Sequence, residues 1–170
     1  MTSSKGLDGL PQSEALAAFL RCCGSQRWAE RMERGRPYAD QRALVDAADR
    51  AFAGLSREDW LEAFSHHPRI GYRGALAARF PATASWSASE QERVANAGED
   101  VLDALLRGNR DYEARFGHIF IVCATGRSAP EMLALLRERL PNEPAAELAL
   151  AAAEQRKITA IRLGKLLAEG

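Results

Sequence analysis

Hydrophobic residues recur three and four positions apart along most of this chain, which is the spacing of a buried helix face. Glycine and proline separate the periodic stretches. The pattern predicts helices at Pro11–Cys22, Ser25–Arg34, Asp40–Ala53, from Ser56 to His66, from Ser87 to about Arg107, at Asp111–Arg115, at Pro130–Leu140 and at 145–168. Gly108 and Asn109 are expected to break the chain between two of them.

Residues that favour helices also dominate the composition, with Ala, Leu, Arg and Glu abundant and β-branched residues scarce. We therefore expect an all-α fold, a bundle of roughly eight or nine helices. A chain of 170 residues fits one domain, 1–170, in which residues 1–9 are expected to be a flexible N-terminal segment.

One run departs from the helical pattern. Phe116 to Ala124 is the most strand-like stretch, and it predicts a short extended apolar segment near residues 117–124. The chain offers no second run of similar quality to pair with it. Its backbone amides and carbonyls therefore need other partners, and a polar ligand is one such partner.

The pair His66-His67 precedes Pro68 at the end of the fourth predicted helix. Proline disfavours the α conformation in the residue before it, so the helix should stop at about His67. This position is able to present a titratable imidazole to a pocket, but taken alone the motif favours a helix stop in which the histidines cap the last carbonyls.

Two more positions allow a structural and a functional interpretation. Ser87 followed by Glu90 is a capping-box pattern, yet a helix start also offers free amides to an anion. Arg162 lies on an apolar stripe of the last helix with Ile158 and Leu166. An inward guanidinium needs an acceptor, which is either a protein group or a bound anion.

Charge and cysteine content restrict the function classes. Lys plus Arg and Asp plus Glu both number 23, so the basic excess of a nucleic-acid-binding protein is absent. Three cysteines, two of them adjacent, do not form a disulfide framework. The start of the chain lacks an apolar signal region, and no stretch approaches a membrane span. We expect a cytoplasmic protein without nucleic-acid or membrane partners.

Four blocks in this order resemble the OHCU decarboxylase family, whose members decarboxylate 2-oxo-4-hydroxy-4-carboxy-5-ureidoimidazoline during urate breakdown. The blocks are His67-Pro68-Arg69-Ile70-Gly71, Ser87-Ala88-Ser89-Glu90-Gln91, Tyr112 to Phe120 and Lys157 to Leu163. The resemblance extends from about Leu10 to Leu167. It implies an all-helical, cofactor-free carboxy-lyase that produces S-allantoin, acts on an anionic small molecule and forms a homodimer.

The resemblance also implies the roles of individual residues. His67 and Glu90 would be catalytic, and the substrate would contact Pro68, Ser87, Phe116, Gly117, Ile119 and Arg162. Whether His67 or Glu90 delivers the proton stays open. Many relatives have an aromatic residue where this chain has His118, so His118 is not counted as catalytic.

Three alternatives remain at this stage. A non-catalytic helical interaction domain explains the Ala- and Leu-rich stripes and the balanced charge. A decarboxylase of a related ureido or imidazoline acid fits the same residues. A metal site built from His66, His67 and His118 lacks a usual ligand spacing, so no metal is expected.

Overall fold

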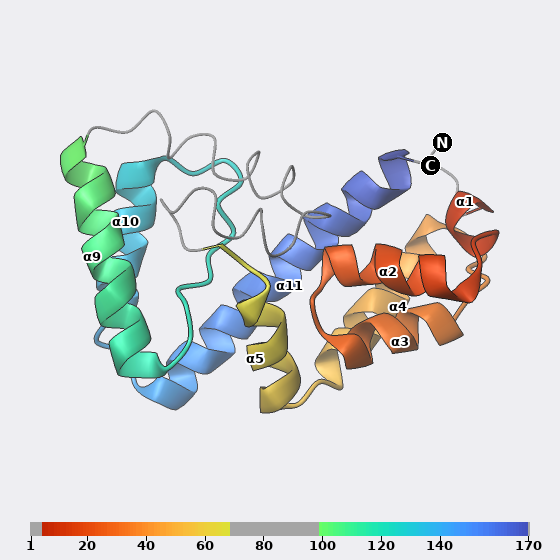
Figure 1. Ribbon diagram of the computed structural model, residues 1–170, viewed down its shortest axis with the longest axis horizontal. Coiled ribbons are helices and arrows are strands. Elements are labelled where there is room, and N and C mark those ends of the chain that lie inside the picture. Colours follow the sequence, from red (N-terminus) through yellow and green to blue (C-terminus); the bar gives the residue numbers. More distant parts are fainter. Residues whose placement is uncertain (1–4, 69–98, 170) are drawn as a thin grey trace. The chain divides into compact units, whose positions relative to one another are not determined.

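The described part of the chain is all-α, as the sequence predicts. A computed structural model describes residues 5–68 and 99–169, and these residues contain no strand. Their eight helices (Figure 1) are α1 (Lys5–Asp8), α2 (Gln12–Cys22), α3 (Gln26–Arg34), α4 (Gln41–Ala53), α5 (Arg57–Ser65), α9 (Glu99–Phe116), α10 (Ala129–Arg139) and α11 (Pro144–Glu169). None of these helices combines the length and the apolar character that a membrane crossing requires.

The described residues divide into two compact units. One unit contains residues 5–63 and 155–169, and the other contains residues 64–68 and 99–154. Helices α5 and α11 each contribute residues to both units. A single domain spanning 1–170 stays a prediction.

Helices α2, α3 and α4 pack around Trp28 in the first unit. The indole ring is fully buried and meets Phe19 edge to face, with the ring centroids 6.0 Å apart. Its Nε1–H donates to the carbonyl of Ala48 at 3.1 Å, so the polar atom of this large side chain is satisfied. Ser25 and Asp40 accept hydrogen bonds from the first turns of α3 and α4, which explains why those helices begin where the sequence predicts.

Part of the N-terminal segment lies within the described residues, and the flexibility expected for residues 1–9 stays a prediction. Residues 5–8 form the short helix α1, and Leu7 is buried. Arg36 donates from Nη1 to the carbonyls of Leu7 and Leu10, at 2.9 Å in each case. These partners lie 26 or more residues apart in the chain, which is why the local pattern did not reveal the contact.

Helix α9 runs through Gly108 and Asn109, so the predicted break there, and with it the separate helix at Asp111–Arg115, is wrong. Gly108 is needed for close packing, because a Cβ atom there would lie 2.1 Å from Cδ2 of Leu136 on α10. Asn109 is buried and donates from Nδ2 to the carbonyl of Leu105 at 2.8 Å, within the same helix. The predicted helix from Ser87 lies outside the described residues as far as residue 98.

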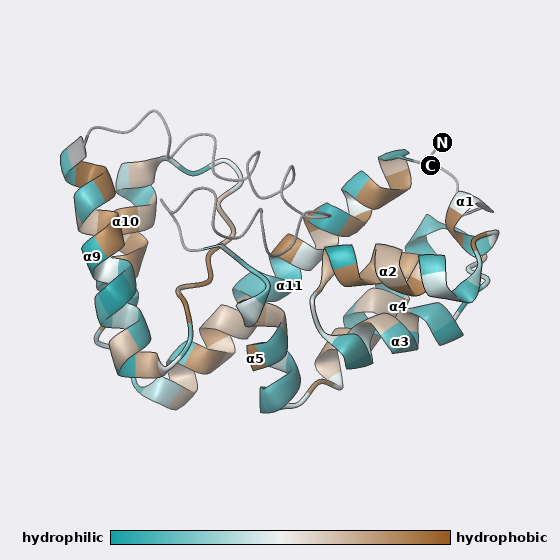
Figure 2. Ribbon diagram, in the orientation of Figure 1, coloured by the Kyte–Doolittle hydropathy of each residue, from teal (hydrophilic) through white to brown (hydrophobic). Residues whose placement is uncertain are grey.

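The second unit is built on the contact between α9 and α10, which lie side by side in Figure 1. Ser128 caps α10, and Glu131 completes a reciprocal capping box with it. The segment 117–128 connects the two helices without regular secondary structure, and Figure 2 shows hydrophobic colouring along it. The buried core of this unit consists of Leu105, Tyr112, Phe120, Val122, Ala129, Met132, Leu133 and Leu136.

Candidate functional site

His67 stands at the end of α5, as Pro68 predicts. The helix ends at Ser65, and the backbone N–H of His67 donates to the carbonyl of Phe64 at 3.1 Å. The side chain of His67 is 9% exposed. The local sequence thus places His67 in a turn after the helix. Packing leaves only a small part of its surface open to solvent.

Residues 116–119 lie where α9 gives way to the connecting segment. Phe116 is the last residue of α9, and Gly117 follows it with a φ of 76°. Glycine adopts this left-handed conformation without a steric penalty. Its N–H donates to the carbonyl of Glu113 at 2.9 Å. The chain therefore turns sharply at Gly117, and Ile119 follows half-buried.

An aromatic contact brings the end of α5 to this segment. The rings of Phe64 and His118 have centroids 5.3 Å apart, and His118 also stacks on Phe116 at 6.2 Å. Nδ1 of His118 lies 3.0 Å from the carbonyl oxygen of Ile119. A carbonyl only accepts, so Nδ1 carries the proton in this contact. His118 thus packs among aromatic rings and contacts the backbone at Ile119.

Arg162 is buried in the first unit, as its place on an apolar stripe predicts. It is 3% exposed and lies on α11 one turn after Ile158, which is also buried. Cys22 and Cys23 are close enough for the positive charge of Arg162 to act on their thiols. Burial nevertheless raises the pKa of Cys22 to about 12 and that of Cys23 to about 11. Both thiols therefore stay neutral near pH 7.

The burial of these thiols leads to a testable expectation. Cys22 and Cys23 are 0% and 1% exposed, whereas Cys123 is half-buried. Iodoacetamide reacts with the exposed thiolate, so at about pH 8 the native protein is expected to be alkylated at Cys123 first. Mass spectrometry of the native and the denatured protein measures this. Rapid alkylation of the Cys22-Cys23 pair in the native protein would contradict the burial of this pair.

The predicted site residues do not all lie in one described part of the chain. Ser87 and Glu90 lie outside the described residues. His67, Pro68, Phe116, Gly117 and Ile119 belong to the second unit, and Arg162 belongs to the first. Within the described residues, no group of three or more His, Cys, Asp or Glu side chains is arranged to hold a metal ion.

A buried polar cluster in the second unit, formed by Tyr112, Arg139 and Glu147, was not predicted from the sequence. No feature of the sequence around Glu147 marks this residue as buried. A signal did exist on α10, because Arg139 follows Met132 and Leu136 at helical spacing on the buried face.

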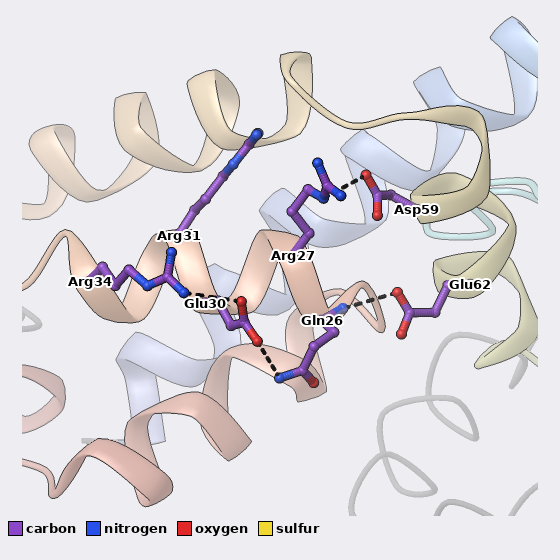
Figure 3. A pocket seen from close by; sticks show the side chains of 7 residues that line it. All are labelled: Gln26, Arg27, Glu30, Arg31, Arg34, Asp59 and Glu62. Atoms are coloured by element: carbon purple, nitrogen blue, oxygen red, sulfur yellow. Dashed lines mark hydrogen bonds and ion pairs between the residues drawn. The ribbon is translucent and has the colours of Figure 1, made fainter.

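A charged hollow lies between α3 and α5 in the first unit (Figure 3). It encloses about 470 Å³ and is lined by Gln26, Arg27, Glu30, Arg31, Arg34, Asp59 and Glu62. Arg27 pairs with Asp59 at 3.3 Å, Arg34 pairs with Glu30 at 3.3 Å, and Arg31 donates to the carbonyl of Ala51. Each guanidinium already has a protein acceptor, so this hollow suggests no reaction chemistry.

Comparison with known proteins gives consistent matches. A family model of OHCU decarboxylase matches residues 8–164. A uric acid degradation bifunctional protein from Arabidopsis thaliana is 42% identical over 149 residues, which cover 87% of this chain but only 46% of the plant protein. A 2-oxo-4-hydroxy-4-carboxy-5-ureidoimidazoline decarboxylase from Amia calva is 33% identical over 142 residues, covering 78% of this chain and 75% of that protein.

Solved structures agree with these matches. A crystal structure of OHCU decarboxylase in the presence of (S)-allantoin is 39% identical, with a TM-score of 0.75, and the match covers 88% of this chain and 96% of that one. A crystal structure of (S)-allantoin synthase shares the fold, with a TM-score of 0.71 at 18% identity. That match covers 96% of this chain and 53% of the synthase chain.

Proposed function

Since the chain belongs to the OHCU decarboxylase family, we propose that it is a carboxy-lyase that converts 2-oxo-4-hydroxy-4-carboxy-5-ureidoimidazoline to (S)-allantoin and carbon dioxide. The observation that carries this proposal is the family match, which extends over residues 8–164 and so includes nearly the whole chain. The similar structure solved in the presence of (S)-allantoin supports the same product.

The substrate can lose carbon dioxide without an external electron sink. The bond between the ring carbon and its carboxylate breaks, and the electron pair forms a double bond to the neighbouring ureido-bearing carbon. The imine electrons of that carbon move onto the ring nitrogen. Protonation of the ureido-bearing carbon then creates the stereocentre, the adjacent hydroxyl loses its proton to become a carbonyl, and the ring nitrogen takes up a proton, so that one proton is consumed overall. The protein must orient the carboxylate, stabilise the developing charge and deliver the proton to one face.

His67 suits the proton transfer, since an imidazole titrates near neutral pH. The enclosed position of its side chain, at 9% exposure, supports this role because a shielded ring limits exchange of the proton with bulk water. Glu90 acts in this proposal as the partner of His67 or as the acceptor for the ureido group. Pro68 fixes the backbone beside the histidine.

Arg162 holds the anionic oxygens of the substrate in this scheme, and Ser87 contributes at the start of its helix. The burial of Arg162, at 3% exposure, supports the assignment, because a guanidinium shielded from water attracts an anion more strongly than an exposed one. Backbone groups of Phe116, Gly117 and Ile119 complete the contacts. No cofactor or metal takes part.

The assembly and location of the protein belong to the same proposal. The family resemblance supports a homodimer, which size-exclusion chromatography with light scattering would measure. The three free cysteines fit a reducing cytoplasm.

The reaction is tested by circular dichroism of allantoin while urate is oxidised by urate oxidase and hydroxyisourate hydrolase. Adding this protein is expected to produce one enantiomer quickly, because the enzyme controls both the loss of carbon dioxide and the face of protonation. An unchanged, slow and racemic background would refute the proposal. In that case, absence of saturable binding of (S)-allantoin would favour a helical interaction domain, and binding without turnover would favour a related ureido acid as substrate.

A further inference from the structure

A buried polar network links α9, α10 and α11 in the second unit. Glu147 on α11 is fully buried and accepts from three side chains. Tyr112 on α9 donates its hydroxyl to Oε1, Arg139 on α10 donates from Nε to the same oxygen at 2.7 Å, and Asn142 donates from Nδ2 to Oε2 at 3.0 Å. Burial and this hydrogen bond raise the pKa of Tyr112, so the phenol remains a donor.

The guanidinium of Arg139 extends this network to the connecting segment. Its Nη1 donates to the carbonyl of Ile121 at 2.7 Å, and its Cζ lies 4.6 Å from the centroid of the Phe120 ring. Arg139 is itself only 7% exposed. One planar cation therefore connects a carboxylate on α11 to the backbone and an aromatic side chain of the segment 117–128.

Side chains also hold the residues on either side of Ile121. Nδ1 of His118 contacts the carbonyl oxygen of Ile119 at 3.0 Å, and Oε2 of Glu154 accepts from the N–H of Cys123 at 2.8 Å. Every second residue from 119 to 123 thus has a backbone group fixed by a side chain. An extended segment without a partner strand needs other hydrogen-bond partners, as expected from the sequence, and these side chains are some of them.

Tyr112 joins this network to the candidate contacts at 116–119. Its ring centroid lies 4.6 Å from that of Phe116, 5.5 Å from that of His118 and 5.2 Å from that of Phe120. The hydroxyl of the same residue is fixed by Glu147. The position of the segment is therefore coupled to the network at its start through ring contacts and at Ile121 through a hydrogen bond.

We propose that Arg139 and Glu147, with Tyr112, are positioning residues for the decarboxylation site, holding the backbone of residues 116–121 in the geometry that the substrate requires. This inference rests on the proposed function. A buried ion pair is often no more stabilising than apolar residues of the same volume. The ion pair contributes direction instead. Glu147 holds one edge of the Arg139 guanidinium, and Nη1 of the same guanidinium then donates to the carbonyl of Ile121.

The test compares Arg139→Lys and Tyr112→Phe with the wild type. Lysine keeps the charge but lacks the planar fork that reaches Glu147 and Ile121 together, and phenylalanine keeps the ring but loses the hydroxyl. Displacing reacting groups by about 1 Å can cost about 100-fold in rate, so Arg139→Lys is expected to lower kcat by up to about 100-fold. Tyr112→Phe is expected to lose less, up to about tenfold. Both variants should yield allantoin of lower enantiomeric excess.

The matched control is Arg137→Lys, an exposed arginine on the same helix, which should retain the wild-type kcat and enantiomeric excess. Hydrogen exchange gives a readout independent of activity: the amides of residues 119–123 should exchange faster in Arg139→Lys than in Arg137→Lys. If Arg139→Lys does not fold, Tyr112→Phe decides the question.

A variant that has a lower melting temperature but wild-type kcat and enantiomeric excess would overturn the inference, since the network would then be merely structural. A wild-type protein that fails to accelerate decarboxylation would refute the proposed function itself. The two failures are thus distinguished by the activity of the wild type.

Discussion

Replacing His67 by asparagine is expected to lower kcat by about 10²–10⁴-fold, which is the usual contribution of general acid–base catalysis. Asparagine is similar in size and retains a polar side chain, but it does not exchange a proton near neutral pH. The turn itself should persist, because the backbone N–H of residue 67 donates to the carbonyl of Phe64 and Pro68 still follows. Circular dichroism should also detect lower enantiomeric excess, since protonation would no longer be confined to one face.

His66 offers a matched control for this substitution. It is the neighbouring residue and is half-buried, and no catalytic role is assigned to it. His66→Asn should therefore retain kcat close to that of the wild type. A His67→Asn variant that works at the wild-type rate, with the same enantiomeric excess, would remove His67 from the mechanism.

Replacing Arg162 by lysine is expected to lower kcat/KM by about 10²–10³-fold, the range measured when one donor to a developing anion is removed. Lysine keeps a positive charge, but it cannot present two parallel N–H donors to a carboxylate. Burial makes the loss larger than at the surface, because Arg162 is 3% exposed and neighbouring groups have little freedom to compensate. Steady-state kinetics and the inhibition constant of (S)-allantoin measure the change.

The control for Arg162 lies on the same helix. Arg156 is half exposed and pairs with Asp49 at 2.8 Å, so Arg156→Lys should change neither kcat/KM nor the inhibition constant. Arg162→Ala gives a second test, since added guanidinium at low millimolar concentration should restore part of its activity. Full activity of a folded Arg162→Lys variant, or lack of any rescue together with unchanged (S)-allantoin binding, would show that Arg162 serves the fold alone.

The positions of the helix ends around the first unit follow from local sequence. Ser25 and Asp40 cap α3 and α4, and each acts on amides three residues ahead. Pro68 acts on the residue directly before it, so the turn that carries His67 could be predicted without knowledge of the fold. The apolar stripe of α11 likewise indicated that Arg162 is buried, because its neighbours on the stripe lie one turn away.

The errors arose where a distant contact overrides local preference. Gly108 and Asn109 favour a break when taken alone, yet α9 continues because α10 approaches Gly108 closely at Leu136. Glycine is the residue that allows two helices to come this near, so a helix breaker in sequence becomes a packing residue in the fold. A distant contact also acts on α1, because Arg36, which follows α2 and α3 in the chain, donates to the carbonyl of Leu7.

The sequence by itself determined the all-α class, the turn at His67, the inward direction of Arg162 and, through its motifs, the family. These features depend on residues a few positions apart, whose geometry is set by backbone sterics and helical periodicity. Only the tertiary structure decided that Tyr112, Arg139 and Glu147 meet, and that Arg139 orients the carbonyl of Ile121. Tyr112 and Glu147 are 35 residues apart, and a charged side chain becomes a buried partner only when packing removes water from both groups.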